Sequence, residues 1–195
     1  MGAPRRMSRE SRRTSLLESA AALVEQGGVG AVTFEAVAEA AGVAKTLPYA
    51  YFESREEILL ALFDRVIGGI DADVASVLGQ EQAFEEVVRQ SLDVWFDAVR
   101  DHGRLVGGLL DGRSEGGLAA AIRRRDRRSH KLWHDLVADR FQLTDRHADV
   151  LAAMLTTTAT AVVDLWVRRK GSQDSLVSAF VAMATGAAEG LRRSG

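Results

Sequence analysis

The segment AEAAGVAKTLPYAYFES, residues 38–54, decides the fold of the N-terminal part of this chain. An alanine-rich run ends at Gly42, and a second short run follows that closes with Tyr-Ala-Tyr-Phe. Two short helices around a glycine-containing turn are typical of a helix-turn-helix. Pro48 stands inside the second run, and a proline costs about 3 kcal/mol or more in a helix interior but little in the first turn. The sequence therefore predicts a short or displaced helix that begins near Ala44 or later.

The composition predicts a soluble, cytoplasmic protein with a normal core. The chain has 195 residues, enough for one large domain or two small ones, and 47% of them are hydrophobic. A net charge of -2 argues against binding of nucleic acid over the whole surface, and the lack of cysteine excludes disulfides and thiolate metal sites. We expect no membrane-spanning segment, because no apolar run approaches about 18 residues. The charged N-terminus is not followed by the apolar run of a signal peptide.

Apolar residues recur at helical spacing along almost the whole chain, whereas alternating strand patterns are nearly absent. We therefore predict an all-α fold with about nine helices. The expected helices cover 8–27, 34–41, the short third helix, Arg55 to about Ile70, 83–102, 104–110, 118–140, 144–169 and 172–191. Thr33 and Ser54 are the expected N-caps of the second and fourth helices, since their side-chain oxygens can accept a backbone N–H.

A helix-turn-helix places its second helix in the major groove of DNA. Lys45 and Thr46 fall at the start of that helix, where side chains reach base edges. Tyr49 and Tyr51 carry hydroxyls that suit phosphate oxygens, and such contacts fix the register of a protein on DNA. These four residues are predicted DNA contacts.

Three further residues are predicted to contact the DNA backbone. Thr33 and Arg55 each stand at the start of a helix, where free backbone N–H groups favour phosphate. Arg12 belongs to a basic arm, residues 1–14, which holds five arginines against one glutamate and has a net charge of +4. Such an arm beside a helix-turn-helix is an electrostatic contact to DNA, and a solvated start of the chain is the alternative for its first few residues.

Several motifs follow one another between residues 12 and 63: Ala20-Ala21, Gly27, Thr33, Val37-Ala38, Ala41-Gly42-Val43, Tyr49-x-Tyr51-Phe52 and Ser54-Arg55-Glu56-Glu57. In this order and at this spacing they resemble the N-terminal DNA-binding domain of the TetR family of transcriptional regulators. The chain departs from the family at three positions, with Ala44 where Ser is common, Arg55 where Lys is common and Pro48 where an apolar residue is common. Ala44 provides no side-chain N-cap, which costs about 1 kcal/mol.

The resemblance implies a function and a division into domains. Residues 1–54 would form the DNA-binding domain, and residues 55–195 a helical domain that binds a small molecule and builds a homodimer. The implied protein is a ligand-responsive regulator, a repressor that leaves a palindromic DNA operator when a small lipophilic effector binds. Neither a cofactor nor an enzymatic activity is implied. An activator, or a dimeric helical scaffold that does not bind DNA, is the alternative.

Two adjacent apolar stripes on the last helix are more than one core contact needs. We therefore predict that this helix and helix 144–169 form a four-helix interface with a second copy of the chain. The predicted interface residues are Val163, Phe180, Met183, Ala184 and Ala187. Ordinary core packing within one chain is the alternative, because periodicity alone does not separate the two.

Large apolar residues outside that interface are the predicted lining of an effector pocket, since pockets are mostly apolar with a few placed polar groups. They are Trp95, Phe96, Leu109, Trp133, Met154 and Trp166. The inner stripe of helix 118–140 is interrupted by Arg125 or Asp126 and then by Ser129, and we predict Asp126 and Ser129 as polar contacts. The alternative is a solvated helix face, because charge runs on helices usually meet water.

Two histidines raise the question of a metal site. His130 and His134 are four residues apart on one helix face, which resembles half of a zinc site. Position 131 is Lys where a metalloprotease helix needs Glu, and the sequence places no third ligand, so no metal site is predicted. The sequence also shows no phosphate-binding loop and no nucleophile elbow.

Overall fold

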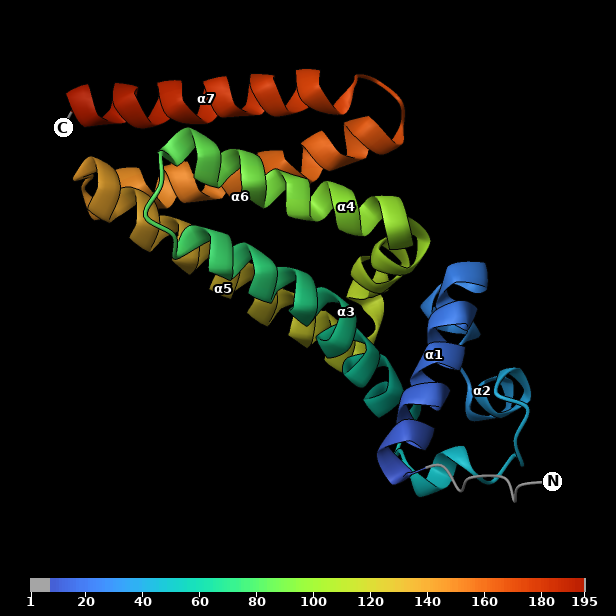
Figure 1. Cartoon of the computed structure of the whole chain (residues 1–195). Helices are drawn as coiled ribbons and strands as arrows, with labels where there is room; N and C mark the ends of the chain where they lie inside the picture. Colours follow the sequence, from blue (N-terminus) through green and yellow to red (C-terminus); the bar gives the residue numbers. More distant parts are fainter. Residues whose placement is uncertain (1–7, 195) are drawn as a thin grey trace. The chain divides into compact units, whose positions relative to one another are not determined.

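The computed structural model describes residues 8–194, and this part of the chain is helical apart from short connections (Figure 1). It contains seven α-helices and three short 3-10 helices. Their bounds are α1 (Arg9–Gly27), η1 (Val29–Ala31), α2 (Phe34–Ala40), η2 (Pro48–Ala50), α3 (Arg55–Leu78), α4 (Phe84–Leu110), η3 (Gly112–Ser114), α5 (Gly116–Phe141), α6 (Asp145–Val167) and α7 (Gln173–Ser194). The predicted all-α fold class is confirmed for the described residues.

The chain divides into two compact units. The N-terminal unit comprises residues up to Gly68 together with His102–Ile122, and the C-terminal unit comprises Gly69–Asp101 together with the chain from Arg123 onward. Helices α3, α4 and α5 each contribute residues to both units.

Seven α-helices occur in the described residues where about nine were predicted, and two local features account for the difference. The short third helix is a 3-10 turn, Pro48–Ala50, because a proline cannot continue an α-helix from the turn before it. The two segments 83–102 and 104–110 belong to the single helix α4, which leaves helical backbone angles only at His102 (φ -139°, ψ 32°).

Helix α3 is longer than predicted. It continues through Gly68 and Gly69 to Leu78, so the expected end near Ile70 was wrong. A Cβ atom at either glycine would meet nothing within 4 Å, which shows that packing does not require glycine there. Glycine lowers helix propensity but does not by itself end a helix whose apolar face is buried.

Helix α2 begins and ends with specific caps. The predicted N-cap Thr33 accepts the backbone N–H of Ala36 with its hydroxyl oxygen at 3.1 Å. At the other end the N–H of Val43 donates to the carbonyl of Ala38 at 3.0 Å, the bond of a Schellman motif. Gly42 adopts a φ of 64° in this motif, a conformation that glycine reaches without strain.

Apolar side chains of α1, α2 and α3 form the core of the N-terminal unit. Its buried residues include Leu16, Ala20, Val24, Val37, Ala38, Phe52, Ile58, Leu59 and Leu62. The last turns of α4 approach α1 closely, because a Cβ atom at Gly108 would lie 2.8 Å from Cγ1 of Val24. The predicted helix-turn-helix is therefore seated on a packed helical base.

The C-terminal unit has its own core, built by α4, α5, α6, α7 and the end of α3. Its buried residues include Val77, Phe84, Val88, Leu92, Phe96, Trp133, Val137, Leu151, Leu155, Val177, Phe180 and Ala184. The rings of Phe84 and Phe141 meet edge to face with centroids 4.9 Å apart, which joins the start of α4 to the end of α5. Helices α6 and α7 run side by side in opposite directions (Figure 1).

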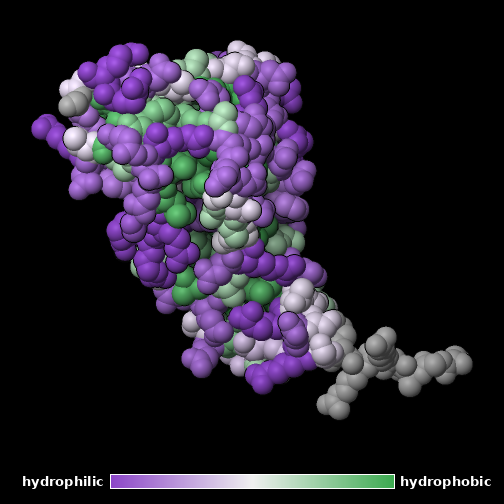
Figure 2. All heavy atoms as spheres, turned by 60° about the vertical axis from the view of Figure 1, so that its left-hand side comes forward, coloured by the Kyte–Doolittle hydropathy of each residue, from purple (hydrophilic) through white to green (hydrophobic). Residues whose placement is uncertain are grey.

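Helix α6 leaves much of its apolar surface uncovered. By length and composition it could cross a membrane, whereas the sequence predicted no apolar run of about 18 residues, and only 22% of its most apolar stretch is buried. Val150, Met154 and Leu165 are 47%, 41% and 40% exposed. Figure 2 shows hydrophobic residues open to solvent among hydrophilic ones on the face turned to the viewer.

Candidate functional site

The segment between α2 and α3 winds in successive tight turns. The N–H of Leu47 donates to the carbonyl of Ala44 at 2.8 Å, and the N–H of Ala50 donates to the carbonyl of Leu47 at 3.0 Å. Pro48 is buried and opens the 3-10 helix η2. The displaced helix that the proline predicted is thus present as a turn of three residues, because Pro48 has no N–H to bond to the preceding turn.

Lys45 and Thr46 precede η2 and are both exposed. The expectation that they begin an α-helix is wrong, because the helical turn starts only at Pro48. Their side chains remain open to solvent on the segment that a helix-turn-helix presents to DNA. Contact of Lys45 and Thr46 with base edges stays a prediction.

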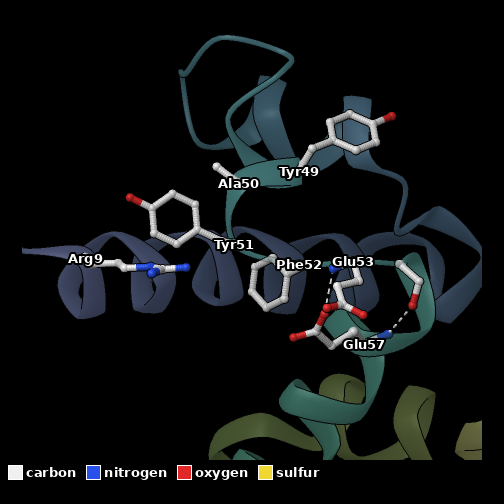
Figure 3. Close-up of a pocket in the computed structure, with 8 residues that line it drawn as sticks. Arg9, Tyr49, Ala50, Tyr51, Phe52, Glu53 and Glu57 are labelled. Atoms are coloured by element: carbon white, nitrogen blue, oxygen red, sulfur yellow. Dashed lines mark hydrogen bonds between the residues drawn. The ribbon is translucent and has the colours of Figure 1, made fainter.

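The two tyrosines of this segment differ in their surroundings. Tyr49 is 57% exposed, and its ring stacks on Phe34 with centroids 4.1 Å apart and planes 6° apart. Tyr51 is partly buried, and the guanidinium carbon of Arg9 lies 5.9 Å from its ring centroid. Figure 3 shows the Tyr51 ring beside Arg9, whereas the Tyr49 ring points away from it. Phe34 therefore holds the ring of Tyr49, and Arg9, a member of the predicted basic arm, lies against the ring of Tyr51.

A shallow hollow opens between the start of α1 and the segment that leads into α3 (Figure 3). It is lined by Arg9, Tyr49, Tyr51, Glu53, Ser54 and Glu57. Glu57 accepts the N–H of Glu53 at 2.6 Å, and the hydroxyl of Ser54 accepts the N–H of Glu57 at 3.1 Å, so Ser54 is the N-cap that the sequence predicted. Two carboxylates in the wall repel phosphate, which leaves Arg9 and the tyrosine hydroxyls as the groups suited to an anion.

Arg55 ties distant segments of the N-terminal unit together. Its guanidinium donates to the carbonyls of Val29 and Val32, both at 2.7 Å, and to the carboxylate of Glu115 at 2.7 Å. The side chains of Arg55 and Glu115 are each 34% exposed. The structure therefore corrects the predicted role of Arg55, because these bonds use the guanidinium within the protein rather than leave it free for phosphate. No local signal could have shown this, since Glu115 lies 60 residues away.

Glu56 forms a second tie to the same segment. Its carboxylate accepts the backbone N–H of Gly117 in the first turn of α5. A Cβ atom at Gly117 would lie 2.8 Å from Cδ of Glu56, so a side chain there would make this carboxylate turn away and lose the bond. The start of α3 thereby holds the start of α5 through two adjacent side chains.

The other predicted backbone contacts lie nearby. Thr33 is exposed, but its hydroxyl oxygen serves as the N-cap of α2. Arg12 is partly exposed on α1, next to Arg13, which pairs with Glu57 at 3.8 Å. The first half of the predicted basic arm, residues 1–7, lies outside the described residues.

The predicted effector residues do not form a single lining. Phe96 is fully buried and meets Trp166 edge to face at 5.0 Å, and Trp133 is 7% exposed in the same core. Met154 is 41% exposed on α6, and Leu109 belongs to the N-terminal unit. The structure corrects these last two assignments, because Met154 is open to solvent and Leu109 lies in a different core.

Arg125 occupies the polar break in α5. Its side chain is 18% exposed, compared with 42% for Asp126, so the inner position belongs to the arginine. Nε of Arg125 donates to both carboxylate oxygens of Asp71 on α3 at 3.0 Å, and the guanidinium carbon lies 4.8 Å from the ring centroid of Trp95. Ser129 is partly buried one turn later. The sequence did not decide whether Arg125 or Asp126 occupies this inner position. It also did not indicate that Asp71, which lies 54 residues away, is the partner of Arg125.

The predicted dimer residues divide into two groups. Phe180 and Ala184 are 4% and 0% exposed in the core of the C-terminal unit, so the prediction that they face a partner is wrong. Val163, Met183 and Ala187 are partly buried at the edge of this core, and their role in an interface stays a prediction.

The exposed faces of α6 and α7 have complementary properties. Val150, Met154 and Leu165 of α6 are large and apolar, whereas the exposed residues of α7 include the small Ala179, Ala182 and Gly186. Small residues allow helix axes to approach closely, because the axial distance depends on the side chains at the contact. The periodicity of the sequence did not predict which face of either helix would be open.

The two histidines of α5 have separate partners. His130 lies 2.9 Å from a carboxylate oxygen of Asp149, and His134 lies 3.2 Å from one of Asp135. Hydrogen bonds from Lys131 and His134 hold the pKa of Asp135 below its usual value. Within the described part of the chain, His, Cys, Asp and Glu do not come together in a group of three that could hold a metal ion.

Comparison with known proteins adds three findings about the sequence. Residues 16–62 match the family described as bacterial regulatory proteins, tetR family. The chain is 31% identical over 101 residues to the HTH-type transcriptional regulator EthR of Mycobacterium tuberculosis, covering 50% of this chain and 46% of that protein. It is 35% identical over 89 residues to the HTH-type transcriptional repressor KstR2 of Rhodococcus jostii, covering 44% of each. The chain thus spans slightly less than half the length of the curated relatives it matches.

A solved structure extends the likeness along the chain. A TetR-like transcriptional regulator from Rhodococcus sp. RHA1 superimposes with a TM-score of 0.77 over 92% of this chain and 96% of that one. The two sequences are 19% identical, so this similarity shows the fold alone.

Proposed function

We propose, from the premise that this chain carries the DNA-binding domain of the tetR family of bacterial regulatory proteins, that the protein is a ligand-responsive transcriptional repressor. The exposed segment between α2 and α3 carries the proposal. It presents Lys45, Thr46 and Tyr49 to solvent, and the stack of Tyr49 on Phe34 ties it to α2. In a helix-turn-helix this segment enters the major groove.

The functional boundary in this proposal is the start of α3. Residues 1–54 bind DNA, and residues 55–195 bind the effector and a second copy of the chain. The proposed DNA contacts are Lys45 and Thr46 at base edges and Arg12, Thr33, Tyr49 and Tyr51 at phosphates. The proposed location is the cytoplasm, where bacterial DNA lies.

The open apolar face of α6 supports a homodimer. Only 22% of the most apolar stretch of α6 is buried within one chain. A second copy that covers this face with its own α6 and α7 gives a two-fold interface of four helices. Two reading segments related by that axis read a palindrome with half-sites about 34–36 Å apart, or a multiple of this distance.

The proposed effector is a small lipophilic molecule that binds in the C-terminal unit. Phe96, Trp133 and Trp166 give this unit an aromatic interior, and pockets for such ligands are mostly apolar. Helix α3 is continuous and carries residues of both units, so a shift of α3 on effector binding changes the placement of the reading segment. The effector lowers DNA affinity only by the difference between its own affinities for the two states.

The proposal is tested by fluorescence anisotropy on the DNA that flanks the protein's own gene, with a scrambled duplex as control, over a salt series. We expect tight, sequence-selective binding with a steep dependence on salt, because phosphate contacts release counterions. Replacing Lys45 by Gln should weaken binding to the flanking DNA, whereas Lys131→Gln, an exposed change on α5, should not. Equal, weak binding to both duplexes by the wild-type protein would contradict the proposal and favour a dimeric scaffold.

A transcription assay separates repressor from activator. Adding the protein to a purified transcription system that carries the flanking DNA should lower the amount of transcript. A rise in transcript would contradict the repressor assignment while leaving the DNA-binding role intact.

A further inference from the structure

We propose that Arg125 is the anchor for the charged end of the effector, and that the effector is an amphiphilic carboxylate that displaces Asp71 from this arginine. The inference rests on the proposed ligand-responsive function and names the chemistry of its ligand. Four groups of the C-terminal unit carry it: the guanidinium of Arg125, the carboxylate of Asp71, the ring of Trp95 and the hydroxyl of Ser91.

The first observation is the position of Arg125 in its helix. It stands in the run Arg-Arg-Arg-Asp-Arg-Arg at 123–128, and the other four arginines of that run are exposed. The side chain of Arg125 is only 18% exposed. Its helix presents fully buried apolar residues one turn before it, at Ile122, and further on at Val137. The guanidinium of Arg125 therefore lies on the inner face of α5, whereas the other arginines of the run belong to its solvated surface.

The second observation is the geometry of the pair with Asp71. Nε and Nη2 of Arg125 both bond to Asp71 at 3.0 Å, so the carboxylate is held by the guanidinium fork. A guanidinium holds a planar carboxylate in this bidentate way wherever the carboxylate comes from. Buried ion pairs are weak evidence for stability, because the cost of removing both charges from water offsets their attraction. Asp71 is 24% exposed, so its carboxylate can turn to solvent when another one replaces it.

The third observation is an unsatisfied polar atom on the same side of α4 as Trp95. The hydroxyl oxygen of Ser91 is buried and has no hydrogen-bond partner among the described residues. Buried hydroxyls in native proteins are normally paired, so this atom calls for a partner that the isolated chain does not supply. Ser91 lies one helical turn before Trp95, whose ring carries the guanidinium of Arg125 at 4.8 Å.

The fourth observation is the register of α4 and α5. Trp95 meets Arg125, and Phe84 meets Phe141, so the two helices run antiparallel. One turn from the first contact, Ser91 on α4 and Ser129 on α5 therefore stand at about the same level. The geometry places two hydroxyl-bearing residues next to the arginine and the aromatic core beyond them. This order, a cation followed by hydroxyls and then aromatic rings, suits a molecule with a carboxylate head and an apolar body.

The exchange links the ligand to the helix that joins the two units. Asp71 belongs to α3, whereas Arg125 belongs to α5. When the effector carboxylate takes the place of Asp71, α3 loses this one bond to α5, while Nη1 of Arg125 keeps its contact with Asp126 at 3.4 Å. The net change is the release of α3 from one of its side-chain ties.

The test uses the full-length protein without DNA, so its outcome is independent of operator binding. The probes are decanoate, below its critical micelle concentration, and decanol of the same chain length. Binding is read from tryptophan fluorescence, since the three tryptophans of the chain all lie in the C-terminal unit. We expect decanoate to bind the wild-type protein more tightly than decanol does. Equal affinity for the two probes, or binding of neither, would overturn the proposal.

Two pairs of variants separate anchoring from folding. Arg125→Gln should weaken decanoate binding by about 10- to 100-fold, the loss of a charged hydrogen bond, whereas Arg124→Gln on the exposed side of α5 should leave it unchanged. Asp71→Asn removes the competing carboxylate and should tighten decanoate binding by about tenfold, whereas the exposed Asp73→Asn should not. A purely structural Arg125–Asp71 pair would predict weaker binding in both Arg125→Gln and Asp71→Asn, and that pattern would refute the exchange.

The same design keeps the two proposals apart. Selective decanoate binding without selective DNA binding would leave the anchor standing and refute the repressor. Selective DNA binding without any preference for decanoate over decanol would support the repressor and refute the anchor.

Discussion

The rings of Phe34 and Tyr49 stack nearly parallel, with centroids 4.1 Å apart and planes 6° apart. Phe34 is the first residue of α2, and Tyr49 is the middle residue of η2, so the stack joins the two halves of the helix-turn-helix. Because Tyr49 is 57% exposed, the stack fixes the position of a hydroxyl that remains open to solvent. A donor held in place before binding loses less conformational entropy on contact with a phosphate.

Replacing Tyr49 by Phe should weaken DNA binding modestly and without regard to sequence. The change keeps the ring on Phe34 and removes only the hydroxyl, so we expect a loss of about 1 kcal/mol on operator and unrelated DNA alike. Anisotropy titrations on both duplexes measure this. Unchanged affinity for both would show that Tyr49 does not contact phosphate. Phe34→Leu is the complementary variant: it keeps the hydroxyl but removes the stack that positions it, so it should also weaken binding to both duplexes.

Replacing Arg55 by Gln should destabilise the protein rather than remove a phosphate contact. The change removes the guanidinium donor from the carbonyls of Val29 and Val32, of which Val29 keeps the N–H of Val32 at 3.2 Å, and we expect the free energy of unfolding to fall by about 1–3 kcal/mol. Urea unfolding measures the loss. Arg65→Gln, which breaks a surface pair with Glu18 at 3.6 Å, should change stability by less than about 0.5 kcal/mol.

The salt dependence of DNA binding decides between the two roles of Arg55. A structural tie predicts that Arg55→Gln leaves the slope of log affinity against log salt unchanged. A slope reduced by about one, with stability intact, would restore the phosphate contact that the sequence suggested.

Alanine at Gly69 should stabilise the protein. The site is inside α3, and an added Cβ would meet nothing within 4 Å, so we expect the unfolding free energy to rise by about 0.5–1 kcal/mol. Gly42→Ala should instead lower the unfolding free energy, because φ is 64° there and a side chain in this conformation costs about 1–2 kcal/mol. Thermal or urea unfolding of both variants tests the pair. A loss of stability for Gly69→Ala would show that α3 is not a straight helix at this position.

Charging the open face of α6 should dissociate the proposed dimer. Met154→Glu and Leu165→Glu place carboxylates where a second copy would bury apolar side chains, and we expect dimer affinity to fall at least about tenfold. Sedimentation equilibrium over a concentration series measures this. Leu132→Glu is the control, since Leu132 is 37% exposed on α5 and lies outside that face. Equal dimerisation of all three variants would place the interface elsewhere.

Signals that act over three or four residues were sufficient for the local structure. Thr33 and Ser54 are N-caps as predicted, because a cap requires only a side-chain oxygen near the first free N–H groups. The displaced turn at Pro48 was also predictable, since the fixed φ and missing N–H of proline act on the same turn of backbone.

Contacts between distant segments could not be predicted from the sequence. Arg55 and Arg125 both read as cations on a helix, and nothing near them pointed to Glu115 or Asp71. Periodicity placed Phe180 on an apolar stripe correctly, but a stripe does not reveal whether the same chain or a second copy covers it. The sequence of one chain therefore shows where its apolar faces lie, and the packed structure is needed to show which of them are buried within the chain.

The bond between Glu56 and Gly117 constrains how this sequence can change over generations. A side chain at position 117 would have its Cβ 2.8 Å from Cδ of Glu56, so the glycine cannot be exchanged while the glutamate keeps its present position. Shortening position 56 to Ala removes the obstacle and the bond together. The two positions should therefore be coupled: a side chain at position 117 makes the exposed carboxylate of Glu56 turn away and lose its bond to the backbone, whereas the same substitution should have no such effect once Glu56 is replaced by Ala.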